Sequence, residues 1–329
     1  MTAIYLNEKD ISGLLTVPEC IPVVEEAMRL FGLGIAVNLP RHRLRSEGFA
    51  LQMMATAIAP MGFAGYKTGG SRAARPSGST GRAGAGGGGT KVHLYSTETG
   101  ELVAIMDAGR MGQIRTGAAT GVGTKYQARA GAGTVGLLGS GYQARTQPEA
   151  ICCVRPITSA MVWSRTAEHA ATFATEMTAK LGIPVTAVAE PQAAAQADIV
   201  VTITSTQQPV LQGAWLLPGA HVNAAGGNSL IRGEVDAETV RRAAIITADS
   251  IEDAKLECAD LMRAVEAGAV NWEQVRELGH VVAGLMPGRT DDQQITLFES
   301  HGLALWDVAA AGVVYTRAKE RGLGVPMPF

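Results

Sequence analysis

The stretch TVGLLGSGYQAR, residues 134–145, constrains the fold of this 329-residue chain more than any other segment. An apolar run typical of a buried strand leads directly into a turn that contains two glycines. Gly139 permits a tight turn, Gly141 lets the backbone approach a pyrophosphate, and the small side chain of Ala144 allows a following helix to pack closely on the strand. That helix would direct its positive end at the phosphates. We therefore predict a dinucleotide-binding turn made of Gly139, Ser140, Gly141, Tyr142, Gln143 and Ala144.

The sequence on both sides of this turn predicts the rest of a doubly wound domain. Short apolar runs alternate with alanine-rich stretches from about residue 134 onward, and the segment 167–182 has the pattern of an amphipathic helix that ends at a glycine. Alternation of strand and helix indicates an α/β fold with a parallel sheet. The predicted strands cover residues 134–139, 159–164, 184–189, 198–205, 220–226, 243–249 and 294–300.

The N-terminal third has a different pattern, with one helix expected at 17–36 and few others between its strands. Its predicted strands cover residues 41–46, 49–59, 63–70, 90–96 and 101–108, and the last two are joined by a hairpin-like turn. These features indicate an α+β domain with a mixed sheet. A helical stretch at 108–129 would carry the chain into the second domain, and a helix at 302–322 could return to the first.

Residues 68–89 consist mostly of Gly, Ser, Ala and Arg and offer almost no apolar area to bury. We interpret this stretch as a surface loop. The alternative is a lid that brings Arg72, Arg75 and Arg82 to an anionic ligand.

Charge and cysteine content exclude several classes of protein. A formal net charge of −2 provides no basic field for nucleic acid or for an anionic membrane, and no apolar run is long enough to cross a bilayer. The four cysteines have no spacing that suits zinc, so we predict no metal site and interpret them as free thiols of a reducing compartment. The N-terminus has no signal-peptide pattern, and we predict a cytoplasmic protein.

Two further strand ends bear on the cofactor. The second strand ends in Ser164, Arg165 and Thr166, where an acidic residue would bind the ribose hydroxyls of NAD. A cation with two hydroxyls suits a 2′-phosphate better, which favours NADP(H) without excluding NAD(H). Thr204 and Ser205 follow another strand, at the carboxyl edge where such sheets bind their ligands.

Four motifs together resemble the ornithine cyclodeaminase and mu-crystallin family. They are the glycine turn, IRTGAATGVGTKYQAR at 114–129, VNAAGGN at 222–228 and ITLFESHGLALWD at 295–307. The resemblance implies a Rossmann domain at 116–302 and a discontinuous substrate-binding domain, at 1–115 and 303–329, that forms a homodimer. It also implies a small α-amino or α-imino acid substrate with NAD(H) or NADP(H) as cofactor.

The same resemblance assigns three cations to the substrate. Arg41 matches the family's arginine after a proline, with Arg43 as the alternative if the match is shifted by two residues. Lys67 matches a central lysine, and Arg115 the arginine that holds the substrate carboxylate. An arginine can offer a planar bidentate fork, which we expect at the start of a helix, and a lysine with a lowered pKa can act as a general acid.

Other matched positions depart from the cyclodeaminase pattern. Asn228 and Gln52 stand where cyclodeaminases carry an aspartate and a glutamate, so neither side chain can ionise here. Asn228 can still orient an imine or a water, and Thr116 is expected to face the pyrophosphate or the nicotinamide ribose. The loss of two acids favours a reductase of α-imino acids, which in reverse is an amino-acid dehydrogenase. The alternatives are an ornithine or lysine cyclodeaminase and a catalytically silent NADPH-binding protein.

Overall fold

A computed structural model describes residues 2–72 and 89–328 of the chain. The chain divides into two compact units. Unit 1 contains Met1–Arg115 and Leu303–Phe329, and unit 2 contains Thr116–Gly302. The helix α3 (Gly109–Gln127) includes the boundary between them, because residues up to Arg115 belong to unit 1 and the remainder to unit 2.

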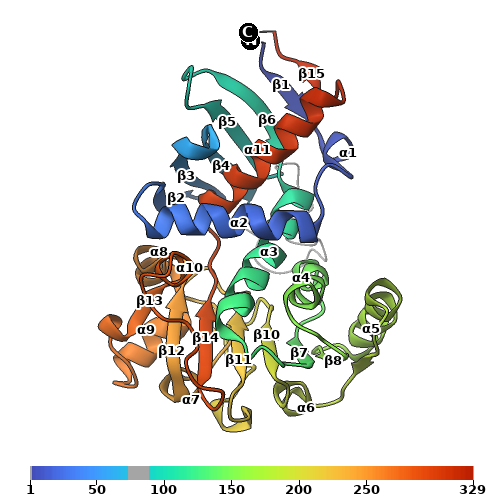
Figure 1. The fold of residues 1–329 in the computed structure, drawn as a ribbon, viewed down its shortest axis with the longest axis vertical. Helices are drawn as coiled ribbons and strands as arrows, with labels where there is room; N and C mark the ends of the chain where they lie inside the picture. Colours follow the sequence, from blue (N-terminus) through green and yellow to red (C-terminus); the bar gives the residue numbers. More distant parts are fainter. Residues whose placement is uncertain (1, 73–88, 329) are drawn as a thin grey trace. The chain divides into compact units, whose positions relative to one another are not determined.

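Unit 1 is built on a seven-stranded mixed sheet (Figure 1). The strands β2 to β6 pair antiparallel in sequence order, whereas β1 is parallel to β6 and antiparallel to β15. In sheet order the strands are β15 (Val325–Pro326), β1 (Ile4–Leu6), β6 (Leu102–Asp107), β5 (Lys91–Ser96), β4 (Phe63–Arg72), β3 (Phe49–Ile58) and β2 (Val37–Ser46).

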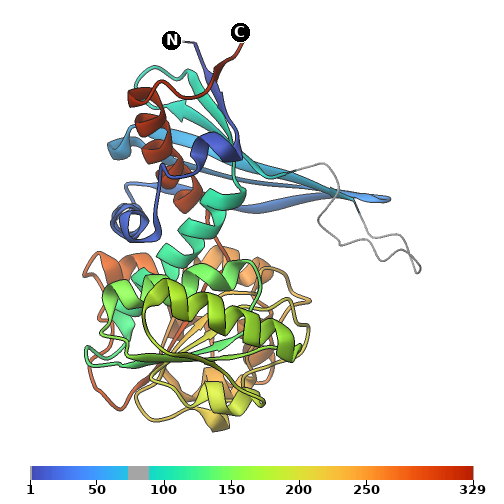
Figure 2. The same ribbon diagram turned by 90° about the vertical axis from the view of Figure 1, so that its right-hand side faces the viewer.

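The long helix α11 (Ala304–Glu320) packs on one face of this sheet, and a second long helix, α2 (Val17–Gly32), packs against α11 (Figure 2). A capping box formed by Thr16 and Glu19 begins α2. Gly312 allows α11 to approach closely, because a Cβ at that position would lie 2.5 Å from the Phe63 ring. Unit 1 also contains α1 (Glu8–Ile11) and the short 3₁₀ turn η1 (Ala59–Met61).

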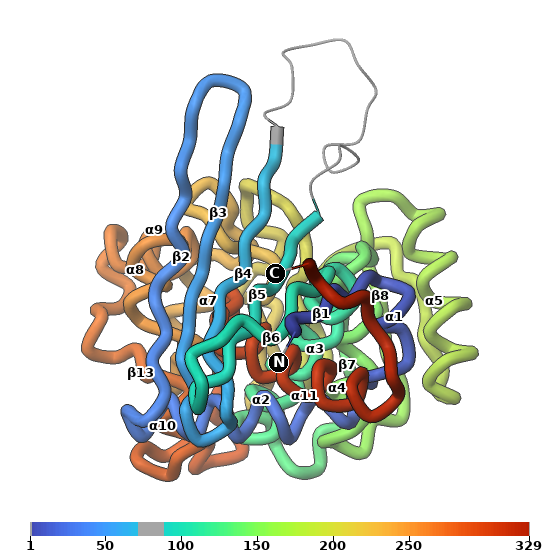
Figure 3. Tube along the Cα trace, turned by 90° about the horizontal axis from the view of Figure 1, so that it is seen from above, coloured from blue at the N-terminus to red at the C-terminus, as the bar shows by residue number. Residues whose placement is uncertain are grey.

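The loop expected at 68–89 was wrong for residues 68–72, which form a strand. They continue β4, where Thr68 pairs with Met53 and Arg72 pairs with Phe49, so β2, β3 and β4 are the long strands of the sheet (Figure 3). Backbone pairing needs no apolar side chain, which is why the composition did not reveal that the strand predicted at 63–70 continues to Arg72. Residues 73–88 of the predicted loop or lid, including Arg75 and Arg82, lie outside the described residues.

Unit 2 contains an eight-stranded sheet in which every pairing is parallel. The chain runs outward from β7 to β8 and β9, then returns to the other side of β7 with β10 and β11, so the strand order reverses between β7 and β10. In sheet order the strands are β13 (Val275–Glu277), β12 (Ala243–Ala248), β14 (Ile295–Glu299), β11 (His221–Ala224), β10 (Ile199–Thr202), β7 (Thr134–Leu138), β8 (Ser159–Trp163) and β9 (Val185–Ala187).

Helices pack around this sheet, whose strands are rich in buried Val, Ile and Leu (Figure 1). The doubly wound α/β fold predicted from the sequence is confirmed by this sheet. Among the described residues, no helix is long and apolar enough to cross a membrane. The helices are α4 (Gln147–Val154), α5 (Ala167–Leu181), α6 (Pro191–Ala195), α7 (Ala237–Arg242), α8 (Ile251–Glu257), α9 (Ala259–Glu266) and α10 (Leu278–Val282), with 3₁₀ turns η2 (Gln143–Thr146), η3 (Gly213–Trp215) and η4 (Trp272–Gln274).

Candidate functional site

The glycine turn follows β7 at the point where the strand order reverses, which is where doubly wound sheets bind their ligands. Gly139 has a φ of +123°, and a Cβ there would lie 2.5 Å from the carbonyl oxygen of Ile203, so only glycine fits. Gly141 has no atom within 4 Å of an added Cβ. The amides of Ser140 and Gly141 donate no hydrogen bond to other described residues. The turn therefore has the open backbone and the free donors that a pyrophosphate requires.

The helix after the turn begins later than the sequence indicated. The turn η2 comes first, and α4 begins only at Gln147. Arg145 fixes the loop instead, since its guanidinium donates to the carbonyl oxygens of Ser140 and Gly141 and to Glu176. Tyr142 is 55% exposed, Gln143 is partly buried, and Ala144 is fully buried against the core.

The end of β8 lies beside this turn, because Gly139 donates its amide to the carbonyl of Trp163 at 2.9 Å. Ser164 and Thr166 are partly buried, and Thr166 is the N-cap residue of α5. Arg165 between them is exposed. This segment therefore presents a cation next to the glycine turn, at the strand end where an acidic or a basic residue would distinguish NAD(H) from NADP(H).

Thr204, Ser205 and Asn228 lie in the loops that follow β10 and β11. Both loops donate hydrogen bonds to Glu234, a buried residue that no sequence motif predicted. Its Oε1 accepts from the amide and the hydroxyl of Thr204, each at 2.6 Å, and its Oε2 accepts from the amide of Gly226 at 2.6 Å. Burial raises the pKa of Glu234 to about 7, against the opposing effect of the Thr204 hydrogen bonds.

More buried acids lie behind Glu234. Burial also raises the pKa of Asp260 to about 6, and Asp260 accepts hydrogen bonds from the backbone of Glu234 and Val235. The described residues include one group of mixed donors that could hold a metal ion, Cys258, Glu299 and His301, all buried. The Cys258 thiol donates to Glu299 at 3.7 Å, and a nitrogen of the His301 ring lies 3.3 Å from Asp249, so these side chains are already partnered.

In unit 1, two predicted substrate cations meet on a carboxylate. Lys67 Nζ and Arg115 Nε donate to the same oxygen of Asp307, at 2.9 and 3.0 Å. Asp307 is fully buried, and the side chains of Lys67 and Arg115 are only 11% and 10% exposed. Gly112 faces the ammonium group, because an added Cβ would contact Lys67 Nζ at 3.4 Å. Two cations thus share one anion, which leaves a surplus of positive charge.

The electrostatics of this group favour a charged partner. Burial lowers the pKa of Lys67 to about 8; the field of Asp307 opposes this shift, whereas the fields of Arg115 and Arg41 add to it. Burial alone would raise the pKa of Asp307, but the nearby Arg115 and Lys67 outweigh it and hold that pKa below its usual value. A substrate carboxylate would relieve the repulsion among the cations.

Arg41 rather than Arg43 is the arginine placed near Lys67. It lies in an irregularity of β2, and its Nε approaches the sulfur of Met54 at 3.2 Å. Met54 is the residue that pairs with Lys67 across β3 and β4. Arg43 instead pairs with Gln52.

We expected Arg115 to begin a helix, and this expectation was wrong. Arg115 is the seventh residue of α3, which begins at Gly109, and its guanidinium carbon lies 5.7 Å from the centre of the Trp306 ring. Among the described residues, Arg115 hydrogen-bonds through Nε alone, so both terminal NH₂ groups remain for a ligand. Thr116, the next residue, is buried.

A sequence model of the ornithine cyclodeaminase/mu-crystallin family matches residues 1–322. The chain belongs to this family. Alanine dehydrogenase from Archaeoglobus fulgidus is 34% identical to it over 330 residues, which cover 100% of this chain and 99% of that relative. The family membership predicted from the sequence is therefore confirmed.

Solved structures of family members match over the whole chain. Delta(1)-pyrroline-2-carboxylate reductase from Thermococcus litoralis, in complex with NADH and L-proline, has a TM-score of 0.91 at 31% identity, covering 98% of this chain and 100% of its own. An archaeal alanine dehydrogenase dimer with bound NAD also has a TM-score of 0.91, at 34% identity, and covers 100% of both chains.

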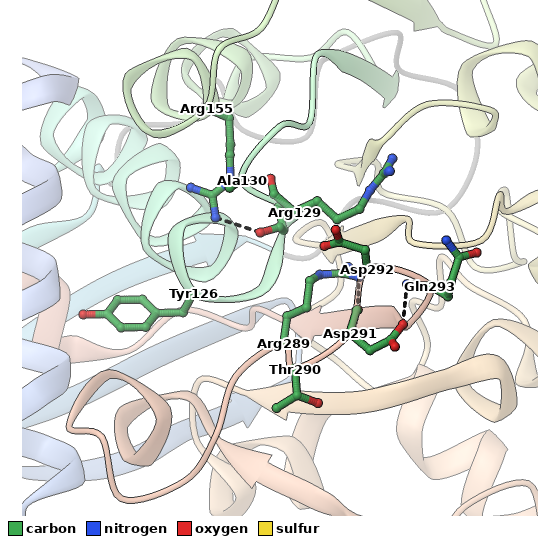
Figure 4. Close-up of a pocket in the computed structure, with 10 residues that line it drawn as sticks. Tyr126, Arg129, Ala130, Arg155, Arg289, Thr290, Asp291, Asp292 and Gln293 are labelled. Atoms are coloured by element: carbon green, nitrogen blue, oxygen red, sulfur yellow. Dashed lines mark hydrogen bonds between the residues drawn. The ribbon is translucent and has the colours of Figure 1, made fainter.

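Unit 2 of this family member also contains a cavity of about 650 Å³, lined by Arg129, Arg155 and Arg289 (Figure 4). It lies at the amino ends of the strands, opposite the edge where such sheets bind ligands. Arg155 and Arg289 stabilise the fold there through hydrogen bonds to backbone carbonyls. Arg155 donates to the carbonyls of Lys125, Ala128 and Arg129, and Arg289 donates to that of Gln127, so together they cap the end of α3.

Proposed function

We propose that this protein is an NAD(P)H-dependent reductase of α-imino acids, acting in reverse as an amino-acid dehydrogenase. The observation that carries the proposal is the pair of buried cations, Lys67 and Arg115, held on one oxygen of Asp307. Such a group stabilises an added carboxylate far better than water does, because its charges are desolvated and fixed in place. The relatives named as alanine dehydrogenase and pyrroline-2-carboxylate reductase support this substrate class.

Arg115 would bind the substrate carboxylate through its two terminal NH₂ groups, since Nε is occupied by Asp307. Lys67 and Arg41 would add charge to the same carboxylate or stabilise the nitrogen side. A lysine whose pKa is lowered to about 8 can also donate a proton to the amine that forms. Asn228 would orient the imine or a water molecule through hydrogen bonds.

The cofactor would bind unit 2 through the turn 139–144. The free amides of Ser140 and Gly141 and the empty space at Gly141 fit a pyrophosphate, so the residues present suit a dinucleotide. Ser164, Arg165 and Thr166 would bind the adenosine ribose, while Thr204, Ser205 and Thr116 would face the nicotinamide half. When bound, the dinucleotide supplies or accepts the hydride.

Turnover of a panel of cyclic imines and of keto-acid and amine pairs, each with NADH and NADPH, tests this function. Oxidation of NAD(P)H that requires the substrate carboxylate is the expected result. Ammonia release from ornithine or lysine without net change in NADH would instead identify a cyclodeaminase. Tight NADPH binding with no turnover across the panel would identify a silent binding protein.

We further propose that unit 1 forms a homodimer through β2 and β3. These strands expose large apolar side chains that water does not favour, among them Val37 at 57%, Leu39 at 52% and Leu44 at 66%. We expect Leu44→Glu to convert the protein to a monomer in sedimentation velocity, and Leu256→Glu, an equally apolar exposed position in unit 2, to leave the dimer intact.

We also propose a cytoplasmic location. The free cysteines among the described residues support it, because a reducing compartment keeps thiols free.

A further inference from the structure

We propose that Glu234 is a positioning residue that holds the nicotinamide end of the cofactor site in shape. The proposal rests on the proposed function, because it requires a dinucleotide on unit 2. Glu234 would not touch the cofactor. It would act through the two loops that follow β10 and β11.

The contacts of Glu234 join these loops to each other. Its Oε1 accepts two hydrogen bonds from Thr204, and its Oε2 accepts one from the Gly226 amide and one from the Thr202 hydroxyl at 3.0 Å. Four donors thus converge on one carboxylate. Only an ionised carboxyl group can accept all of them, because an amide in its place would direct an N–H group at one of the donors.

Glu234 is itself fixed from behind. Its backbone amide donates to Asp260 Oδ1 at 2.9 Å, and its carbonyl accepts from the amides of Val210 and Leu211. Its side chain is buried. The carboxylate is therefore fixed in one position, and its hydrogen bonds fix the two loops relative to each other.

Packing extends the arrangement to the phosphate-binding turn. A Cβ on Gly226 would lie 2.4 Å from the carbonyl oxygen of Thr204 and 2.6 Å from Glu234 Oε1, so the two loops are in contact and tolerate only glycine. A Cβ on Gly139 would lie 3.1 Å from the methyl group of Thr204. Thr204 thus packs against the glycine turn, and the turn itself is held by Arg145 and by the carbonyl of Trp163 rather than by Glu234.

The position of these loops assigns them to the nicotinamide half. In a doubly wound fold the first half, ending at β8, binds adenosine, and the second half, starting at β10, binds the other nucleotide. Loss of Glu234 should therefore weaken binding of the nicotinamide nucleotide and spare the adenosine half. A residue that only stabilises the fold would weaken both halves equally.

Asp198 provides a matched control. It is a carboxylate just before β10, at the opposite edge of the sheet, and it accepts from the amides of Gly133 and Thr134 at 2.9 and 3.1 Å. It therefore fixes backbone amides as Glu234 does, but away from the predicted ligands. We expect Asp198→Asn to lower Tm and to leave cofactor affinity within about twofold of the parent.

The experiment measures the Kd of NADH or NADPH, whichever the parent binds more tightly, and of ADP by calorimetry for the parent, Glu234→Gln and Asp198→Asn. With Glu234→Gln we expect the dinucleotide Kd to rise at least about tenfold, as for loss of a hydrogen bond to a charged group, with the ADP Kd nearly constant. A Glu234→Gln dinucleotide Kd within twofold of the parent, or equal losses of dinucleotide and ADP, would overturn the inference. A parent that bound neither NADH nor NADPH would overturn the proposed function itself, and the inference with it.

Discussion

Lys67 and Arg115 lie on different elements of unit 1, β4 and α3, and both donate to Oδ1 of Asp307, a residue of α11. The other carboxylate oxygen, Oδ2, is buried and has no hydrogen-bond partner among the described residues. Asp307 therefore holds both cations through one oxygen, and it leaves the terminal NH₂ groups of Arg115 for another partner.

We expect Asp307→Ala to disable the substrate site and to destabilise the fold. Removal of one partner from a buried ion pair leaves uncompensated charge, which costs roughly 3–5 kcal/mol. Chemical denaturation should show that loss, and kcat/KM should fall at least about a hundredfold. Asp107→Asn is the control, because Asp107 pairs with the more exposed Lys91 in the same unit, and exposed pairs contribute little. Asp307→Ala with parental kcat/KM would show that Asp307 does not organise the site.

The pH dependence of kcat/KM should report Lys67. Its pKa is lowered to about 8, so the ammonium group is present below that pH and is lost as the pH rises through it. If the charged form binds the carboxylate or donates the proton, kcat/KM falls on the alkaline side of about 8. Asp307→Asn, which removes the opposing field, should move this fall to lower pH. Lys67→Arg should abolish it, since arginine stays charged; a fall that persisted would have to come from another group.

Local sequence was sufficient for the features that a few adjacent residues determine. The strand before Gly139, the tight turn and the need for a small residue at 144 all follow from neighbouring positions, and the structure has each of them. The family resemblance predicted Lys67 and Arg115 as site residues. It did not predict Asp307, although the family motif at 295–307 ends at that residue. Asp307 contacts Lys67 and Arg115 across 240 and 192 positions of the sequence, and no local pattern indicates such contacts.

The helix expected at 108–129 is confirmed as α3, and the separate expectation that Arg115 begins a helix was wrong. Two backbone amides at the start of α3, those of Gly109 and Arg110, are satisfied by Glu8, about a hundred residues earlier, so the helix begins about one and a half turns before Arg115. The role of Glu234 could not be predicted from local sequence. Glu234 lies between β11 and α7, 30 positions after Thr204, and only the fold brings the two residues together.

Replacement of Arg165 should change cofactor preference. If its guanidinium binds a 2′-phosphate, Arg165→Ala raises the Kd for NADPH about tenfold or more and leaves that for NADH nearly unchanged. His169→Ala is the control, since His169 is exposed in the first turn of α5. A parallel fluorescence titration with both cofactors measures the ratio. An equal loss for both would mean that Arg165 packs on the adenine ring, which the two cofactors share.

Replacement of Arg115 separates a substrate-binding role from a structural one. Arg115→Lys keeps a positive charge but loses the planar fork, and Arg115→Ala also leaves Asp307 with Lys67 as its sole charged partner among those described. Loss of a hydrogen bond to a charged group costs about 1.5–3 kcal/mol, which is roughly tenfold to a hundredfold in kcat/KM.

The NAD(P)H Kd should stay nearly constant in both Arg115 variants, because the dinucleotide is expected to bind unit 2. Arg110→Ala is the matched control, as Arg110 is exposed one turn earlier in the same helix. We expect the kcat/KM for the imino acid to fall in the order parent, Arg115→Lys, Arg115→Ala, with Arg110→Ala equal to the parent. Retention of kcat/KM in Arg115→Ala, or simultaneous loss of folding and cofactor binding, would show that Arg115 supports the fold rather than the substrate.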